Sequence, residues 1–414
     1  MLEGEIFLIS LGVMVRLVLV AAAGVFAAWR PVGAPLLPAS ALQQLSRFSA
    51  VVLIPCIIID SIGSSISVKL LRQSVALILY GLGTIGLGLL YARLWGRLCV
   101  PPRLRRSSLW RVAALATGFP NVVAMPLVIV ATVCERKEVK DDFDDFDDCA
   151  KTGAALIFMN SFMWSLVFFT YGIIQLKAIK ASQDRAGGAE APPLPPMPRG
   201  GPLVKFFSEP VNASLVLGTT VGMIRPLQKA LFHSSTNPLR AIGGTIEMLA
   251  APVVCLAIVI TGASLAHVDF DAIGDDLAAE GDAEEPPRIK DEEARATVVV
   301  DDDEHERRKT TALEALYGVR SVVAGFILCR LVFVPATVVC LETVLPLDLP
   351  QKPLGRVVLH VASGMPSAQI LIILLHKFGM SKSAAELSFL FVFQYAASLL
   401  TMTVLISFSL QEVY

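Results

Sequence analysis

The stretch GFPNVVAMP at residues 118–126 and its counterpart ASGMPSAQI at residues 362–370 decide the fold of this chain. Each lies within a long apolar segment, at about 110–134 and 356–376. Proline removes a backbone N–H and clashes with the carbonyl one turn earlier, so it interrupts a helix. Inside a membrane, the freed backbone groups are tolerated only where they line a cavity. Two interrupted spans therefore predict a cavity at membrane depth.

The composition places the chain in the membrane class. It is 54% hydrophobic and 17% charged over 414 residues, and its mean hydropathy is +0.65, whereas soluble domains use roughly 45 to 50% apolar residues. A net charge of −1 gives no basic face for nucleic acid, so we exclude that class of partner. The sequence has no nucleophile elbow, Walker loop or HExxH motif. We therefore expect neither an enzyme nor an ATP-driven pump.

The seven cysteines are scattered, mostly within apolar runs, and none forms a CxxC pair. This pattern predicts no structural metal, no cofactor and no disulfide framework. The N-terminal MLEGEIFLISLGVMVRLVLV lacks a basic start and a small-residue cleavage site. We therefore expect a retained first span in the lipid bilayer rather than a signal peptide.

A spanning helix needs about 20 mainly apolar residues. Ten segments meet or approach this length, and the sequence predicts an all-α membrane protein. The expected spans are 5–28, 42–66, 73–97, 110–134, 150–175, 209–224, 243–266, 316–343, 356–376 and 387–410.

The loops that carry Lys and Arg indicate the orientation, because basic residues are retained on the cytoplasmic side. Most of the 35 Lys and Arg residues lie in the loops that follow the odd-numbered spans, including Arg103, Arg105 and Arg106 between spans three and four. Both termini are therefore predicted to be non-cytoplasmic.

Two connections divide the chain. A Pro/Gly-rich linker at 180–208 separates a first five-helix repeat at 1–179 from a second at 209–414, and we expect it to be flexible. An acidic insertion at about 268–310 lacks the apolar residues needed to offset chain entropy, so disorder is favoured there. The acidic run 141–148 is interpreted as a solvated segment rather than a cation site, because its spacing is not that of a calcium loop.

The halves interrupt their helices at corresponding places. Pro55 in the second span corresponds to Pro252 in the seventh, and Pro120 in the fourth corresponds to Pro366 in the ninth, once the acidic insertion is removed. Because five spans is an odd number, the second half must be inverted relative to the first. This arrangement is typical of transporters built from inverted repeats.

The interrupted spans indicate an organic anion as ligand. Where two discontinuous helices cross, their half-helix N-termini present positive dipole ends, and neutral side chains can hydrogen-bond a carboxylate without burying a second charge. Prolines that merely kink the helices, and polar residues that pack between helices, remain the alternative. The candidate substrate-binding residues are Pro120, Asn121, Pro126, Pro366, Ser367 and Gln369.

Secondary candidates are Pro55, Asp60 and His360. An ionisable residue inside a span is costly and so suggests function. A pair between Asp60 and Arg16 is one interpretation, which no spacing rule supports. His360 is placed to relay a proton near the ninth-span break, and a satisfied interior histidine is the alternative. Arg330 indicates either a pair within the bundle or a misplaced span boundary.

Several segments, in their order and spacing, resemble the auxin efflux carrier superfamily, in particular the PIN-LIKES type. They are LSRFSAVVLIPCIIIDSI in span two, GFPNVVAMPLVIVATVCE in span four, FFSEPVNASLVLGTTVGMIRPL in span six, NPLRAIGGTIEMLAAPVVCLAIVITGASL in span seven, CRLVFVPATVV in span eight and ELSFLFVFQYAASLL in span ten. The resemblance covers nearly all the spans.

The resemblance implies ten spans in two inverted repeats, with the fourth and ninth crossing beside the substrate and a transport unit that moves as an elevator. Asn121 and Pro366 match the family pattern, whereas Ala124 and Gln369 stand where relatives usually have asparagine. The family implies indole-3-acetate as substrate and a homodimer. The short central linker favours the endoplasmic reticulum, with the plasma membrane and vacuole as alternatives.

The sequence therefore predicts a carrier of a small organic carboxylate, auxin or a similar anion, that works by alternating access without ATP. A membrane sensor that binds the ligand without moving it is one alternative. A sodium- or proton-coupled symporter of organic anions is another.

Overall fold

The computed structural model describes residues 2–29, 35–66, 68–122, 124–135, 139, 146–186, 210–234, 237–268, 317–344 and 352–413. Over these ranges the chain is helical, and its one isolated β-bridge joins Pro120 and Ser367. The predicted all-α class is confirmed for this part of the chain. Most of the predicted linker, the acidic insertion from residue 269 onward and the side chains of the run 141–148 lie outside the described residues.

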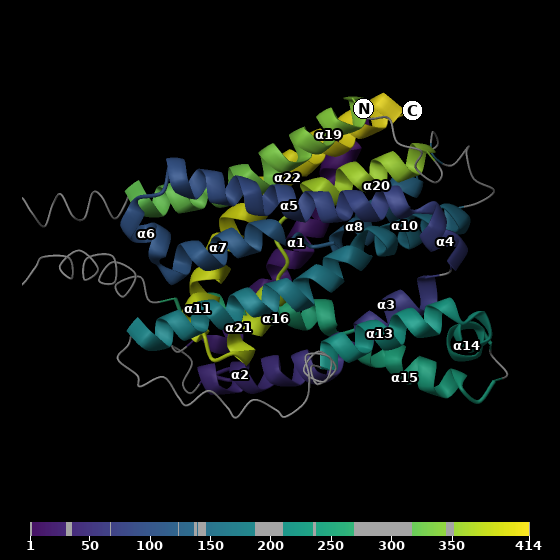
Figure 1. Ribbon diagram of the computed structural model, residues 1–414, viewed down its shortest axis with the longest axis horizontal. Helices are drawn as coiled ribbons and strands as arrows, with labels where there is room; N and C mark the ends of the chain where they lie inside the picture. Colours follow the sequence, from purple (N-terminus) through teal and green to yellow (C-terminus); the bar gives the residue numbers. More distant parts are fainter. Residues whose placement is uncertain are drawn as a thin grey trace, which may run out of the picture.

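Most of the long helices run along the long axis of the molecule (Figure 1). The first half contains α1 (Leu2–Ala28), α2 (Ala39–Phe48), η2 (Ser49–Leu53), α3 (Ile54–Ser65), α4 (Val68–Gln73), α5 (Val75–Leu98), α6 (Pro102–Arg106), α7 (Ser108–Gly118), α8 (Ala124–Cys134), α10 (Phe146–Val167), η3 (Phe168–Gly172) and α11 (Ile173–Ala186). The second contains α13 (Pro210–Met223), α14 (Arg225–Gln228), η4 (Lys229–His233), α15 (Arg240–Ala250), α16 (Val253–Leu265), η5 (Cys329–Phe333), α19 (Val334–Val344), α20 (Lys352–Gly364), α21 (Ile370–Lys377) and α22 (Ser381–Val413).

Six continuous helical segments among the described residues are long and apolar enough to cross a membrane. They are Ala39–Ser65, Val75–Leu98, Thr152–Arg185, Arg240–Leu265, Tyr317–Val344 and Ser381–Glu412. These correspond to six of the ten expected spans. Two of the remaining four, 110–134 and 356–376, are interrupted as their prolines predict, so neither half is long enough alone.

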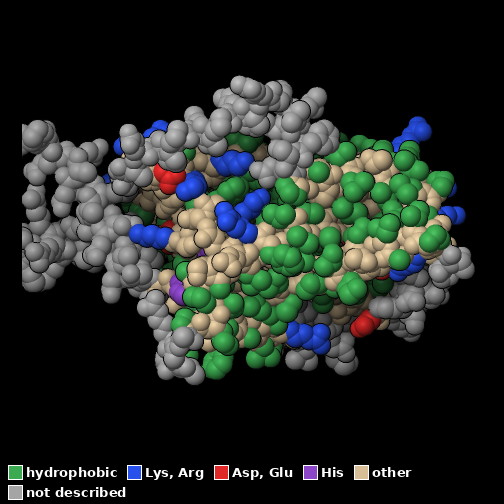
Figure 2. All heavy atoms as spheres, turned by 90° about the horizontal axis from the view of Figure 1, so that it is seen from below, with side chains coloured by type: hydrophobic (Ala, Val, Ile, Leu, Met, Phe, Trp, Pro, Cys, Tyr) green, Lys and Arg blue, Asp and Glu red, His purple; other side chains and the backbone are tan. Residues whose placement is uncertain are grey.

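The surface carries many large apolar side chains, such as Leu19, Leu79, Met248 and Val404. Figure 2 shows a broad hydrophobic area across one face, with Lys and Arg mainly around its border. Apolar surface of this extent is unusual on soluble monomers and suits contact with lipid. The structure thus agrees with an integral, multi-pass membrane protein.

Prolines begin helices at corresponding places in the two halves. Pro55 is the second residue of α3, which follows the π-helix η2, and Pro252 directly precedes α16. The first turn of a helix tolerates proline because its N–H groups lack intrahelical partners. Both prolines lie within helical segments that remain long enough to cross a membrane, so neither interrupts its span as the sequence suggested. Both lead into a helix that borders the candidate site.

Two helix pairs hold the halves together through glycine. α1 packs on α16, and α3 packs on α13. A Cβ atom on Gly24 would clash with the backbone of α16, and one on Gly262 would clash with the backbone of α1. Similarly, Gly222 of α13 leaves no room for a side chain against α3. Small residues let membrane helices approach at backbone distance, so these two pairs are closely packed.

Two expectations are corrected. Cys134 at the end of α8 and Cys149 in α10 form a disulfide, although no disulfide was expected. They lie on either side of a loop whose ends the fold brings together, which scattered sequence positions do not reveal. In addition, α11 continues to Ala186 and so includes the first residues of the predicted linker, with an i,i+4 ion pair between Lys180 and Asp184.

Candidate substrate-binding site

The first interruption separates α7 from α8. α7 begins with a capped turn, in which the Ser107 hydroxyl accepts a hydrogen bond from the Trp110 N–H, and it ends at Gly118. Phe119 then adopts an extended conformation, because a residue before proline avoids the helical region. Pro126 lies in the first turn of α8, where its missing N–H leaves no gap in the helix.

The second interruption separates α20 from α21. α20 ends at Gly364, the chain runs through Pro366 without regular structure, and α21 begins at Ile370 with Gln369 as its N-cap. Met365 and Ser367 are fully buried. The backbone of this segment therefore lies inside the protein, where its polar groups require partners.

The two interruptions meet. The Asn121 N–H donates to the Pro366 carbonyl at 2.7 Å, and the Ala368 N–H donates to the Phe119 carbonyl at 2.8 Å. These bonds form the antiparallel bridge between Pro120 and Ser367. Segments some 250 residues apart in sequence thus satisfy each other's freed backbone groups, as the proline pattern leads one to expect.

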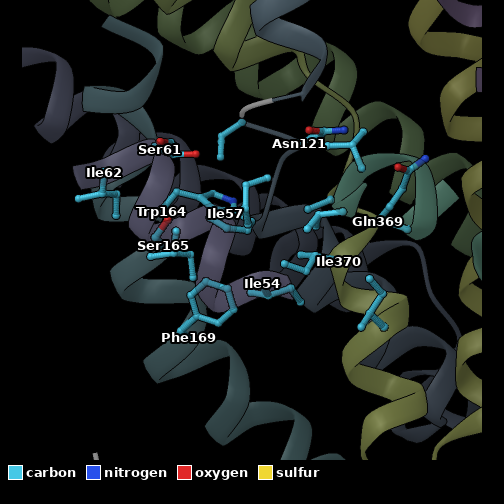
Figure 3. A pocket seen from close by; sticks show the side chains of 18 residues that line it. Ile54, Ile57, Ser61, Ile62, Asn121, Trp164, Ser165, Phe169, Gln369 and Ile370 are labelled. Carbon is cyan, nitrogen blue, oxygen red and sulfur yellow. The ribbon is translucent and has the colours of Figure 1, made fainter. Parts of the chain in front are cut away.

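A pocket lies beside this crossing, and Asn121 and Gln369 are part of its wall (Figure 3). Figure 3 shows these two amides on one side and Trp164, Ser165 and Phe169 on the other. The wall is largely apolar. The full set is Ile54, Ile57, Ile58, Ser61, Ile62, Asn121, Val122, Ser161, Trp164, Ser165, Phe169, Val253, Val254, Ala257, Ala368, Gln369, Ile370 and Ile373.

The electrostatics of the pocket follow from helix direction. Val122 lies just before α8, and Gln369 lies just before α21, so the pocket adjoins the N-terminal ends of both half-helices. A helix N-terminus carries a partial positive charge and readily binds anions. Among the described residues that line the pocket there is no Asp, Glu, Lys or Arg. This part of the wall is therefore positively polarised without a formal charge.

Two lining or adjacent side chains have polar atoms without a partner among the described residues. They are the indole N–H of Trp164, which is 7% exposed, and the hydroxyl of Ser367, which is fully buried. A buried polar group without a partner costs roughly 1 to 3 kcal/mol. A ligand that accepts a hydrogen bond would relieve this cost at Trp164.

Arg330, a residue of the π-helix η5, lies against the C-terminal end of α20. Its guanidinium is fully buried and donates to the carbonyls of Ala362, Ser363 and Met365 at 2.8 to 3.2 Å. These carbonyls form the C-terminal, negatively polarised end of α20. Arg330 thus neutralises the C-terminal end of α20, which would otherwise repel an anion.

α22 fixes the second interruption from the other side. The Gln394 side-chain oxygen accepts from the Ser367 N–H at 2.8 Å, and the Tyr395 hydroxyl donates to the Ser367 carbonyl at 3.0 Å. The Tyr395 hydroxyl also interacts with the Asn121 side chain. Tyr395 therefore connects both interruptions at the edge of the pocket.

The sequence candidates are thus distributed over three places. Asn121 and Gln369 line the pocket, and Pro120, Pro366 and Ser367 form the crossing behind it. Pro55 adjoins the pocket through its neighbour Ile54, whereas Pro126 is buried in α8 and absent from the lining set.

Two other candidates lie away from the pocket. Asp60 is on α3, which packs against α15, where Arg240 and Glu247 form a bidentate ion pair. Arg16, by contrast, is exposed on α1. His360 is 1% exposed and contacts Glu342 and Ser409.

Sequence reasoning missed the contribution of α10 and η3, which supply Ser161, Trp164, Ser165 and Phe169. A signal was present in the segment FMNSFMWSLVFF at 158–169, where hydroxyls and aromatic rings alternate within an apolar span. The aromatic rings are clustered: Trp164 stacks on Phe168 with centroids 4.6 Å apart. This cluster supports the pocket wall opposite the amides.

An all-helical membrane protein whose two proline-broken helices cross beside a pocket belongs, by its architecture, to the transporter class. Residues 9–188 match the family model described as membrane transport protein. The match agrees with the resemblance to the auxin efflux carrier superfamily but does not distinguish the PIN-LIKES type. No curated protein matches the chain.

Proposed function

We propose that this protein carries a small organic carboxylate with an aromatic body, such as indole-3-acetate, across a membrane by alternating access without ATP. The observation that carries the proposal is the pocket at the N-terminal ends of α8 and α21, with Asn121 and Gln369 at its wall. This site combines a place for one negative charge with a place for an apolar ring.

Three neutral groups provide hydrogen bonds for a carboxylate: the amides of Asn121 and Gln369 and the indole N–H of Trp164. Together with two dipole ends, they compensate a single charge without burying a counter-ion, which is costly at membrane depth. The rings of Trp164 and Phe169, with the isoleucines of α3, suit a flat apolar body. An aromatic molecule with one negative charge therefore fits a pocket wall that is polar in one part and apolar in another.

The helix contacts support ten spans in two inverted repeats. If spans one to five correspond to spans six to ten, the pair α1–α16 corresponds to the pair α13–α3, and both pairs pack together. The same exchange relates α10–α20 to α22–α7, which also pack together. Because the pocket lies between α3 and α16 on one side and the crossing on the other, an elevator movement of the crossing unit is part of the proposal.

The disulfide supports the proposed orientation. The loop between spans four and five is predicted to be non-cytoplasmic, and Cys134 and Cys149 lie at its two ends. Disulfides persist in the lumen of the endoplasmic reticulum and outside the cell and are rare in the cytosol. We therefore propose non-cytoplasmic termini and, from the short linker and the PIN-LIKES resemblance, the endoplasmic reticulum membrane. A homodimer rests on that resemblance alone.

The test is flux through the full-length protein in lipid vesicles. Exchange of labelled indole-3-acetate against the unlabelled acid should be several-fold above protein-free vesicles. Asn121→Ala should raise the KM for exchange about tenfold, because a hydrogen bond to a charged group contributes roughly 1.5 to 3 kcal/mol. The matched control is Asn212→Ala, which removes a buried asparagine of α13 outside the pocket.

The outcomes separate the remaining classes. Binding of indole-3-acetate without exchange would show that the protein is a sensor and not a carrier. Exchange that disappears when sodium is replaced by potassium would establish sodium coupling. Equal loss of exchange in the Asn121 and Asn212 variants would contradict the assigned site.

A further inference from the structure

A second buried polar cluster lies outside the pocket, between α19, α20 and α22. Nε2 of His360 lies 2.6 Å from Oε2 of Glu342, and Nδ1 lies 2.9 Å from the hydroxyl of Ser409. Nε of Arg356 lies 2.6 Å from the other oxygen of Glu342. None of these residues lines the pocket. The cluster thus joins three membrane helices through ionisable groups.

The charge of this cluster depends on one proton. Arg356 and Glu342 cancel each other, so the cluster is neutral when the imidazole is neutral and carries +1 when the imidazole is protonated. His360 and Glu342 are 1% and 4% exposed, whereas the side chain of Arg356 is 36% exposed. Arg356 therefore reaches the protein surface, while the imidazole and carboxylate atoms lie inside the protein.

Other charged and titratable groups on the helices packed around His360 do not replace these partners. Tyr80 of α5 lies in the field of Glu342, and Glu412 of α22 is exposed. Arg330 of η5 is held by carbonyls at the far end of α20. Among the described residues, Glu342 is thus the carboxylate in contact with His360.

α20 connects the cluster to the crossing. His360 lies one turn before Gly364, where the helix ends, and the chain then leads through Pro366 to Gln369 in the pocket wall. The Ser363 hydroxyl donates to the His360 carbonyl, and the Ser363 carbonyl accepts from Arg330. A change at His360 therefore acts on the helix that leads into the crossing beside the site.

We propose that His360 and Glu342 form a proton-binding site, and that one proton bound there accompanies each organic anion through the membrane. The inference rests on the proposed function and specifies its coupling ion. In the neutral imidazole Nε2–H donates to the ionised Glu342, so the incoming proton binds Nδ1, which faces the Ser409 hydroxyl, and the same nitrogen releases it. The added positive charge is offset by the anion in the pocket, so the loaded protein gains no net charge, which lowers the cost of crossing lipid.

The first experiment measures accumulation of labelled indole-3-acetate in vesicles that contain the full-length protein, under an inward gradient of one pH unit. One proton per anion supports up to about tenfold accumulation, since one pH unit corresponds to 1.36 kcal/mol. Protein-free vesicles reach the same limit more slowly, because the undissociated acid crosses lipid unaided with its own proton. Accumulation is therefore scored as the initial rate of uptake above that of protein-free vesicles. His360→Gln and Glu342→Gln should abolish this excess rate and retain exchange at equal pH.

The matched control is His376→Gln. His376 is a second buried histidine, 2% exposed, and its described hydrogen-bond partner is the Ser264 hydroxyl rather than a carboxylate. This variant should accumulate the acid as the unaltered protein does. Exchange in the unaltered protein without accumulation, or accumulation that survives in His360→Gln, would overturn the proton site and leave the carrier intact. Failure of exchange in the unaltered protein would instead reject the proposed function.

A second measurement tests, without a transport assay, whether His360 binds a proton. In protein labelled at histidine, the His360 ring, assigned by comparison with His360→Gln, should gain a proton between pH 8 and pH 5, and Glu342→Gln should shift this titration to lower pH. A His360 ring that keeps one protonation state over this range would refute the site. So would a titration unchanged by Glu342→Gln, which a purely structural contact would give.

Discussion

The two interruptions at the crossing are stabilised in different ways. The Pro120 segment packs through rings: Phe119 is fully buried and contacts Phe168 and Trp164 at centroid distances of 4.9 and 6.2 Å. The Pro366 segment is held by polar groups, because Arg330 and two side chains of α22 bind its backbone. One half of the site therefore depends on shape and the other on hydrogen bonds.

This difference indicates which interruption holds the other in place. The backbone at 362–367 has partners from η5 and α22 that are independent of the first interruption. The Phe119–Asn121 segment, by contrast, obtains its backbone hydrogen bonds from Pro366 and Ala368. Perturbing the second half should therefore disturb both, and perturbing the first should disturb mainly itself.

Arg330→Met should have the largest effect. It leaves three buried carbonyls without their donor, and each unsatisfied buried polar group costs roughly 1 to 3 kcal/mol. We expect a clear drop in the thermal unfolding midpoint in detergent, together with loss of exchange. Arg320→Met on the same span is the control, because Arg320 is exposed. Equal midpoints for the two variants would show that the second half does not depend on this cation.

Phe119→Leu should have a smaller, more local effect. The replacement keeps an apolar side chain but loses the edge contacts with Phe168 and Trp164, worth about 0.5 to 1.5 kcal/mol per aromatic pair. The unfolding midpoint should fall modestly, and the KM for indole-3-acetate should rise, because Trp164 loses support. Phe26→Leu, at an exposed ring of α1, gives the baseline. A midpoint drop as large as that of Arg330→Met would reverse the proposed order of the two halves.

Tyr395→Phe should have the smallest effect. It removes only the hydroxyl that joins the Ser367 carbonyl to the Asn121 side chain. A neutral hydrogen bond contributes about 1 kcal/mol, so the KM for exchange should rise about fivefold with little change in the unfolding midpoint. Tyr171→Phe, whose hydroxyl contacts Arg93 at 3.4 Å, is the control. An unchanged KM would mean that Asn121 is positioned by its backbone alone.

The sequence was most informative where one residue type constrains the backbone by itself. Pro120 and Pro366 predicted both interruptions, and their correspondence predicted that the interruptions would lie together. Asn121 and Gln369 were chosen because they adjoin those prolines, and both line the pocket. These inferences needed only local geometry and the cost of bare backbone in a membrane.

The other parts of the site depend on contacts between distant segments, which positions in the sequence do not reveal. Arg330 was ambiguous because its partners are backbone carbonyls, which carry no residue identity. Trp164 entered the site because α10 packs beside α8, and the same contact brings Cys134 to Cys149. His360 was singled out by its position, but its carboxylate partner, Glu342, belongs to a different span.

The glycine contacts of α1 with α16 and of α3 with α13 have a mechanical consequence. They hold α16 against α1 and α3 against α13, and the pocket residues on α3 and α16 are isoleucine, valine and alanine with the single hydroxyl of Ser61. This side of the pocket offers a ligand few hydrogen bonds, whereas the amides and dipole ends belong to the crossing segments. In the elevator movement that we propose, the anion would therefore stay bound to the crossing segments and move along the apolar surface of α3 and α16.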